Sequence, residues 1–115
     1  MKFSVVVLIV PEEDENRAVG ILKHAGATGL TILKGKGLRH NERKTFLGLG
    51  LERKESVLLC VVEKQLSMRM LRSVKVEMKL DEPGGGLAFS LPLGSVVGIG
   101  LAQMQAFRRE VEEDL

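Results

Sequence analysis

The chain carries the same order of apolar segments twice, and this repeat limits how it can fold. Each half has a short apolar run, an amphipathic stretch with apolar residues three or four positions apart, and a second apolar run. Short runs are typical of buried strands, and the longer spacing is typical of helices. In chain order the six segments span 3–10, 12–25, 28–34, 56–62, 66–78 and 87–93. The pattern predicts an α+β fold with the order βαββαβ, in which a four-stranded antiparallel sheet carries both helices on one face.

Such a sheet leaves its other face bare. The predicted strands are apolar at nearly every position, and exposed apolar surface costs about 25 cal/mol per Å². Self-association of the chain is the simplest way to cover this face. The last apolar residues recur at roughly helical spacing and predict a short C-terminal helix that helps to cover it; they are Leu101, Met104, Phe107 and Val111.

A glycine-rich stretch, Asp81–Phe89, separates the second predicted helix from the last strand. Pro83 cannot continue the helix, and Gly84–Gly86 allow backbone conformations that a Cβ forbids, so we expect a sharp turn. Exposed backbone N–H groups in such a turn can hold an anion. Composition alone favours the simpler interpretation, in which the glycines only reverse the chain.

The stretch between the two halves, 35–55, shows no helix or strand period. It opens with Gly-Lys-Gly, and its segment 38–44 carries Arg39, Arg43 and Lys44 against one acid, Glu42. A long connection without structure in a small domain is usually functional. We therefore expect a mobile basic arm that meets a partner. The alternative is a solvated hairpin extension without a partner.

Composition narrows the class of protein. The 115 residues predict one domain over 1–115, and a formal net charge of +2 with no Tyr or Trp gives no support for nucleic-acid binding. A single cysteine and no recognisable export signal predict a reducing, cytoplasmic setting. Cys60 falls within a predicted strand and is expected to be a small core residue. The uncharged stretch 84–107 is broken by glycines and a proline, so we expect no membrane span there.

The order of several short segments resembles the PII signal-transduction family. These segments are Gly26–Thr31, Lys36–Gly37, Gly84–Phe89 and Leu91–Leu93. The resemblance covers roughly Lys2 to Ile99, and the sequence is most similar to a divergent PII-like branch with a Pro-Gly-x-Gly-Ile-Ala-Phe signature. It implies a ferredoxin-like homotrimer with nucleotide sites in the clefts between subunits. It also implies a non-enzymatic regulator of a partner protein, either an enzyme or a membrane transporter.

The resemblance implies roles for two groups of residues. The ligand, for which ATP, ADP and AMP are the candidates, is expected to contact Gly29, Thr31, Gly35, Lys36, Gly37, Gly84, Gly85, Gly86 and Leu87. The partner is expected to contact a loop over about 37–55 through Leu38, Arg39, His40, Asn41, Arg43, Lys44 and Phe46. The glycine stretch, about 81–87, is the expected phosphate-contacting loop. No catalytic residue and no metal ligand is assigned.

The sequence also departs from the family. Typical PII proteins place a lysine after the last glycine of the turn and two arginines near the end of the domain, where this chain has Leu87, Gly98 and Gly100. Losing cations whose charge-assisted bonds contribute about 1.5 to 3 kcal/mol each weakens triphosphate binding unless others replace them. The candidate replacements are Lys36 and Arg39.

Nitrogen regulation of the usual kind is also called into question by the sequence. The glutamine that helps typical members to hold magnesium and 2-oxoglutarate aligns near Asn41, and a chain without tyrosine cannot be uridylylated on one.

Other classes of function have less support. The serines lack a nucleophile elbow, and His24, His40 and Cys60 lack the spacing of a nucleophile with its base. His40 could join Glu42 in a metal-linked trimer of similar fold, although a solvated loop histidine is the simpler interpretation. A trimeric scaffold that binds a partner without sensing a ligand remains the principal alternative.

Overall fold

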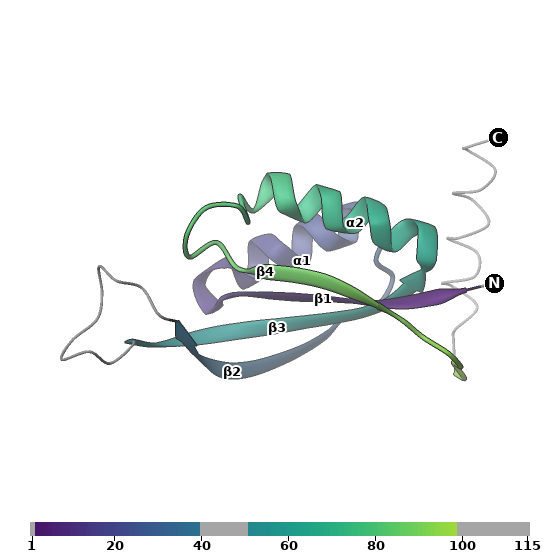
Figure 1. Ribbon diagram of the computed structural model, residues 1–115, viewed down its shortest axis with the longest axis horizontal. Helices are drawn as coiled ribbons and strands as arrows, with labels where there is room; N and C mark the ends of the chain where they lie inside the picture. Colours follow the sequence, from purple (N-terminus) through teal and green to yellow (C-terminus); the bar gives the residue numbers. More distant parts are fainter. Residues whose placement is uncertain (1, 40–50, 99–115) are drawn as a thin grey trace.

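The computed structural model describes residues 2–39 and 51–98. Within these ranges the chain forms four strands, two α-helices and one short 3-10 helix (Figure 1). In chain order they are β1 (Phe3–Pro11), η1 (Glu12–Asp14), α1 (Glu15–His24), β2 (Thr31–Arg39), β3 (Leu51–Glu63), α2 (Lys64–Glu77) and β4 (Leu87–Pro92).

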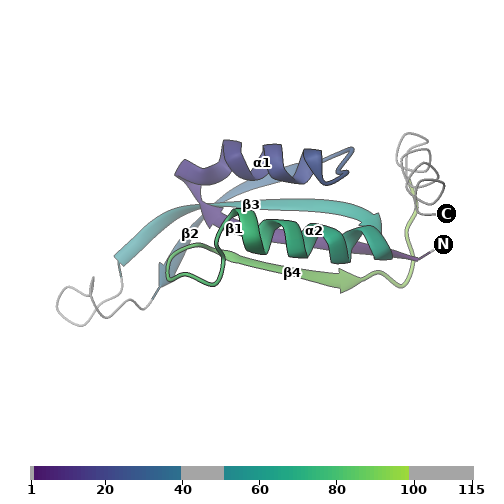
Figure 2. The same cartoon turned by 90° about the horizontal axis from the view of Figure 1, so that it is seen from above.

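The strands form one antiparallel sheet with the order β2-β3-β1-β4. Both helices lie on the same face of this sheet (Figure 1), and the view from above shows them side by side over the strands (Figure 2). The α+β fold with the order βαββαβ, predicted from the repeat of apolar segments, is therefore confirmed. No helix in the described ranges has the length and apolar character needed to cross a membrane.

The core lies between the sheet and the helices. Side chains alternate along a strand, so Val6, Leu8 and Val10 of β1 point toward the helices and are at most 1% exposed. They belong to one buried cluster with Leu22 of α1 and Met70 of α2. These are the positions that the apolar patterns of 3–10, 12–25 and 66–78 place on the buried sides of their elements.

The opposite sheet face is apolar and has no covering layer in the described structure. The strand register places Leu33, Val7, Leu59 and Phe89 on neighbouring strands of this face. Leu33 is 51% exposed, while Val7, at the centre of the sheet, is nearly buried by its neighbours alone. We call this surface the open face. Its side chains in the described strands are apolar, as the sequence predicts.

The hairpin of β2 and β3 is longer than predicted. Its ladder continues from Gly35 opposite Glu55 to Arg39 opposite Leu51. The expectation that 35–55 lacks regular structure is therefore wrong for 35–39 and 51–55. Backbone pairing needs no apolar side chains, and the alternation of glycine with lysine concealed the strand from a hydrophobic-period analysis. At its other end β2 begins at Thr31, three residues later than predicted.

Two predictions fall outside the described residues. One is the central part of the partner loop, with His40, Asn41, Arg43, Lys44 and Phe46. The other is the C-terminal helix over 101–111.

Helix α2 ends at Glu77, close to the end of the segment 66–78 that predicted it. The amide of Leu80 donates to the carbonyl of Lys75 at 3.1 Å, and that of Lys79 donates to Val76 at 3.3 Å. Lys79 has a left-handed backbone, with a φ of 53°. This pair of bonds around a left-handed residue closes many helices. The helix therefore ends by its own backbone closure, and Pro83 lies within the turn that follows.

Candidate ligand-binding site

The turn between α2 and β4 has no room for a side chain at Gly85 or Gly86. The amide of Glu82 donates to the carbonyl of Lys79 at 3.0 Å, and that of Gly85 donates to Glu82 at 3.1 Å. A Cβ on Gly85 would lie 2.6 Å from the Lys79 oxygen. A Cβ on Gly86, which has a φ of 123°, would lie 2.5 Å from the Ile9 oxygen. The turn therefore needs glycine at both positions because the backbone passes so close to itself and to β1.

The same turn leaves backbone donors available. In the described part of the chain, the turn's backbone hydrogen bonds use the amides of Glu82 and Gly85, and none uses the amide of Gly84 or Gly86. Backbone N–H groups without an internal acceptor, in a turn with left-handed residues, can bind an anionic oxygen. The geometry thus permits an anion at the turn, and anion binding there stays a prediction.

One cationic side chain reaches the glycines. Arg53 of β3 donates from Nη1 to the carbonyl of Gly84 at 3.0 Å and from Nη2 to Oε1 of Glu55 at 3.2 Å. Its Nε is buried and has no hydrogen-bond partner in the described structure. Arg53 pairs with β2 but lies beyond the end of β1, so its side chain can extend past β1 to the turn. It therefore connects the turn to the β2–β3 hairpin.

Glu55 continues this connection into β2. Glu55 is 7% exposed, and a Cβ added to Gly37 would overlap the Glu55 carboxylate. Gly37 is directly opposite Arg53 in the ladder, so the absence of a side chain there makes room for the carboxylate beside the arginine. These contacts connect the glycine turn to the β2–β3 hairpin. We call them the turn–hairpin link, and its residues are Gly84, Arg53, Glu55 and Gly37.

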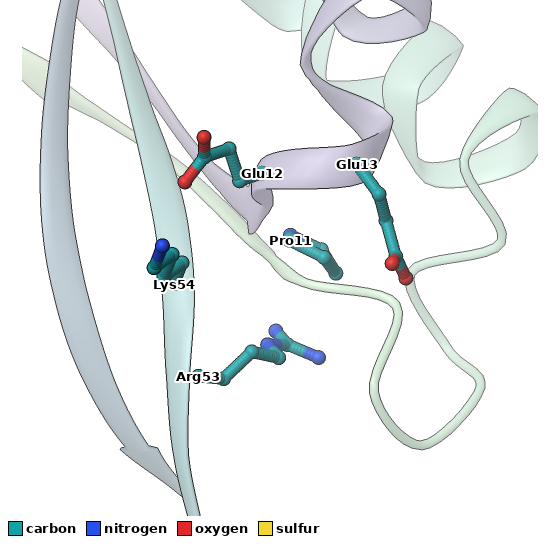
Figure 3. A pocket seen from close by; sticks show the side chains of 5 residues that line it. All are labelled: Pro11, Glu12, Glu13, Arg53 and Lys54. Carbon is teal, nitrogen blue, oxygen red and sulfur yellow. The ribbon is translucent and has the colours of Figure 1, made fainter.

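A pocket of about 460 Å³ lies beside this link. Figure 3 shows Arg53 extending from β3 toward Pro11, while Lys54 lies nearer to Glu12. Two carboxylates and two cations share the pocket, so its charge is balanced. Its lining residues are Pro11, Glu12, Glu13, Arg53 and Lys54.

A second polar cluster lies on the helix-covered side of the sheet. Oε1 of Glu15, at the start of α1, accepts from the hydroxyl of Ser56 at 2.6 Å and forms an ion pair with Lys34. The Lys34 ammonium and the Ser56 hydroxyl hold the pKa of the Glu15 carboxyl below its ordinary value. These contacts tie the first turn of α1 to β2 and β3.

The structure brings only some of the predicted ligand residues together. Gly84, Gly85 and Gly86 form the turn, and Gly37 reaches it through Arg53 and Glu55. Gly35 lies directly opposite Glu55 in the ladder.

The other predicted ligand residues lie apart from the turn within one chain. Lys36 pairs with Lys54, and strand alternation places its side chain on the opposite side of the sheet from Gly37. Thr31 pairs with Leu59, four residues along β3 from the link, and Gly29 lies beyond it. Within one chain, Lys36 therefore lies apart from the turn.

The remaining predictions concern the ends of two strands. Leu87 begins β4 opposite Ile9 and is half exposed on the open face. Leu38 and Arg39, predicted for the partner loop, are the last residues of β2. Leu38 is exposed, so it is available for contact with another molecule.

Arg53 and Glu55 were missed by the sequence analysis. Both lie in a stretch that was interpreted as loop, where a charged side chain has no defined direction. The available signal was alternation, because Arg53, Glu55 and Val57 would share one face of an extended third strand. Nothing in the sequence showed that this face would meet the glycine turn.

Cys60, which the sequence predicts to be a core residue, lies within β3. Cys60 is buried beside Met70, and burial raises the pKa of its thiol to about 11. At neutral pH this thiol is protonated and is therefore a poor nucleophile. The described residues contain no cluster of three or more His, Cys, Asp or Glu side chains suited to a metal ion.

The architecture corresponds to that of solved PII proteins. The structure of B. subtilis GlnK in complex with ATP superposes with a TM-score of 0.67 at 18% identity, covering 84% of this chain and 85% of that chain. Another B. subtilis GlnK structure gives 0.61 at 19% identity, covering 84% and 90%. A PII-like signaling protein from Thermus thermophilus gives 0.59 at 18% identity, covering 81% and 88%.

These similarities define the class of fold. No model of a known family and no curated protein matches the sequence. The chain has the PII-like, ferredoxin-like fold, as the resemblance implied. At 18–19% identity the solved structures establish the fold and not the ligand or the partner.

Proposed function

We propose that this protein is a cytoplasmic, non-enzymatic regulator of the PII-like type. It forms a homotrimer, binds an adenine nucleotide against the glycine turn in clefts between subunits, and controls a partner protein through the β2–β3 hairpin. The observation that carries the proposal is the glycine turn itself, whose unused amides lie at one end of a sheet with a bare apolar face. One structural neighbour, B. subtilis GlnK, was solved with ATP.

The open face supports the proposed assembly. Leu87 and Leu91 of β4 and Leu33 of β2 are each about half exposed on this face. Monomeric proteins rarely leave a continuous apolar surface of this kind in water. Packing three open faces together covers it and brings the glycine turn of each subunit close to a neighbouring chain.

The shape of the β2–β3 hairpin supports the proposed control of a partner protein. β3 continues beyond the end of β1, where Pro11 pairs with Glu55, so residues 51–54 of β3 have only β2 as a strand partner. The turn–hairpin link joins this projecting part to the turn. A ligand can shift the hairpin from one arrangement to another only if it binds the two arrangements with different affinity. The identity of the partner, an enzyme or a membrane transporter, is left to experiment.

Isothermal titration calorimetry tests the proposal. The protein is titrated with ATP, ADP, AMP and cyclic AMP, with and without magnesium, at physiological salt. We expect one of these nucleotides to bind at micromolar concentration and Gly85→Val to abolish that binding, because the added side chain meets the Lys79 carbonyl.

A matched substitution provides the control. Gly20→Val adds the same side chain to α1, where a Cβ would have nothing within 4 Å, and should leave binding unchanged. Equal binding by the wild type and Gly85→Val would contradict the role of the turn. If the wild type binds no nucleotide in the panel, the scaffold without ligand sensing becomes the better explanation.

A further inference from the structure

We propose that the outer side of α2 binds an acidic segment of the same chain, residues 110–114. This segment has the sequence Glu-Val-Glu-Glu-Asp and lies outside the described ranges. The inference concerns a surface that the proposed function does not use, and its tests need no nucleotide.

The outer side of α2 is positively charged along its length. Residues that point away from the core recur three or four positions apart in a helix. In α2 these positions hold four cations and two apolar side chains, Met68 and Val76, each more than half exposed. The only acid within α2 is Glu77, whose Oε2 accepts from the Ser73 hydroxyl at 3.0 Å. We call this surface the cationic face, and it consists of Lys64, Met68, Arg69, Arg72, Lys75 and Val76.

This distribution of charge disfavours the helix on its own. Arg72 lies three residues from both Arg69 and Lys75, and like charges at that spacing repel each other. Lys64 is the first residue of α2, where the positive end of the helix dipole disfavours a cation. Lys75 approaches Asp81 at 3.8 Å, but both side chains are exposed to water, which weakens the pair. Negative charge bound along the cationic face would therefore stabilise α2.

Segment 110–114 has the composition that complements this face. Four of its five residues are acids, and the fifth is Val111. The acids are attracted to the cations of the face, while Val111 can pack against Met68, so that both side chains lose contact with water. Arg108 and Arg109 precede the segment and mark where the acidic stretch begins.

The path of the chain brings the segment to the right end of the sheet. The amide of Leu93, just after β4, donates to the carbonyl of Phe3 at 2.9 Å, and the amide of Lys64 donates to the carbonyl of Lys2 at 2.9 Å. The end of β4 and the start of α2 therefore lie at the same end of the sheet (Figure 1). The 12 residues from 99 to 110 span about 18 Å as a helix and about 40 Å when extended. The 14 residues of α2 span about 21 Å, so the acids can reach the cationic face in either form.

Other described cations do not form a comparable group. Lys2 lies beside the start of α2 and Lys23 lies in the last turn of α1, but each is a single charge. Lys36 and Lys54 pair with each other on the β2–β3 hairpin, at the opposite end of the sheet (Figure 1). Among the described elements, α2 alone presents four cations on one side.

The predicted C-terminal helix offers a different place for the segment. If 101–111 covered the open face, as the sequence predicts, residues 110–114 would lie on the other side of the sheet from α2. The two placements exclude each other within one chain, so a measurement that locates the acids decides between them.

Carbodiimide cross-linking locates the acids, because it joins a carboxylate to an ammonium only where the two are in contact. Mass spectrometry should find links from 110–114 to Lys64 or Lys75. The ion pair of Glu15 with Lys34 is the internal control and should form a link in the same sample.

Three outcomes of the cross-linking would contradict the inference. One is a sample in which the control pair links and 110–114 does not. Another is a segment that links to Lys36 and Lys54 as often as to the lysines of α2. The third is a set of links that join labelled to unlabelled chains in an isotopic mixture, because they would place the segment on another copy.

A charge reversal at the centre of the face tests its energetics. Arg72→Glu is made in the natural sequence and in a background without the acidic charges, which carries Glu110→Gln, Glu112→Gln, Glu113→Gln and Asp114→Asn. In that background Arg72→Glu should raise the melting temperature, because its pairs with Arg69 and Lys75 become attractive. In the natural sequence the new glutamate also repels the bound acids. Its effect there should be less favourable by about 2 to 4 °C at low salt.

Lys36→Glu is the matched control for this reversal. Lys36 lies opposite Lys54 in the hairpin, so the change also removes a like-charge pair, but far from α2. It should shift the melting temperature equally in both backgrounds. The difference found for Arg72→Glu should disappear in about 0.5 M salt, where exposed charges are screened. Equal shifts by Arg72→Glu in the two backgrounds at low salt would show that only water covers the cationic face, and the inference would be wrong.

Discussion

Leu8 and Ile9 are neighbours on β1, yet they face two different environments. Leu8 points into the layer between sheet and helices and is fully buried within one chain, while Ile9 points to the open face and is only partly buried. The helix-covered face is completed by the chain itself. The open face is apolar in the same way but has no cover in the described structure, and in the proposed trimer another copy buries it. The comparison separates what folds this domain from what assembles it.

The largest effect is expected on the helix-covered face. Leu8→Ala should lower the free energy of unfolding by about 2–5 kcal/mol, because it removes a fully buried side chain and leaves a cavity. Urea unfolding followed by circular dichroism measures the loss. Ile9→Ala is the matched variant on the other face. If assembly buries Ile9 as proposed, the loss of stability for Ile9→Ala should grow with protein concentration, whereas the loss for Leu8→Ala should not. Equal concentration dependence would remove the distinction between the two faces.

A charge on the open face should break the assembly and leave the fold intact. Leu33→Lys places an ammonium at a half-exposed apolar position of β2. Light scattering after size exclusion should show a monomer for this variant and a trimer for the wild type. Val76→Lys, on the exposed surface of α2, is the control and should remain trimeric. A trimeric Leu33→Lys would mean that the open face is covered in some other way.

The smallest effect is expected for the polar cluster of Glu15, Lys34 and Ser56 on the helix-covered side of the sheet. Because Lys34 and Ser56 lower the pKa of Glu15, the stabilisation from these contacts is present above the pKa of an unfolded glutamate. It is lost as the pH falls through the lower pKa of the folded state. The melting temperature of Glu15→Gln should therefore decline less than that of the wild type between about pH 5 and pH 3. Parallel declines would show that the ion pair contributes little to stability.

The fold could be predicted from the sequence because buried apolar residues recur at the period of the strand or helix that carries them. The apolar positions of 3–10, 12–25 and 66–78 were enough to place Leu8, Leu22 and Met70 in one core, and the order of elements was enough to give the sheet. Element ends were less accurate. The extension of β2 and β3 depends on backbone hydrogen bonds, which leave no pattern of apolar side chains.

The candidate site was only half predictable, for a related reason. The three glycines mark a turn by their composition, and the turn is where the sequence put it. Arg53 and Glu55 act across 31 and 18 residues of chain, toward Gly84 and Gly37, so their role depends on the register of the hairpin. A charged residue at a strand edge looks the same in sequence whether it faces water or a neighbouring turn.

The unequal lengths of β1 and β3 have a consequence for how such a protein can evolve. The described part of the hairpin beyond β1 contributes no side chain to the main buried cluster, so its outward residues can change without loss of the domain's stability. Partner specificity can therefore diversify there while the scaffold stays constant. The fixed requirement is at the root, where Gly37, Arg53 and Glu55 fit together, whereas an exposed residue such as Leu38 can change with the partner.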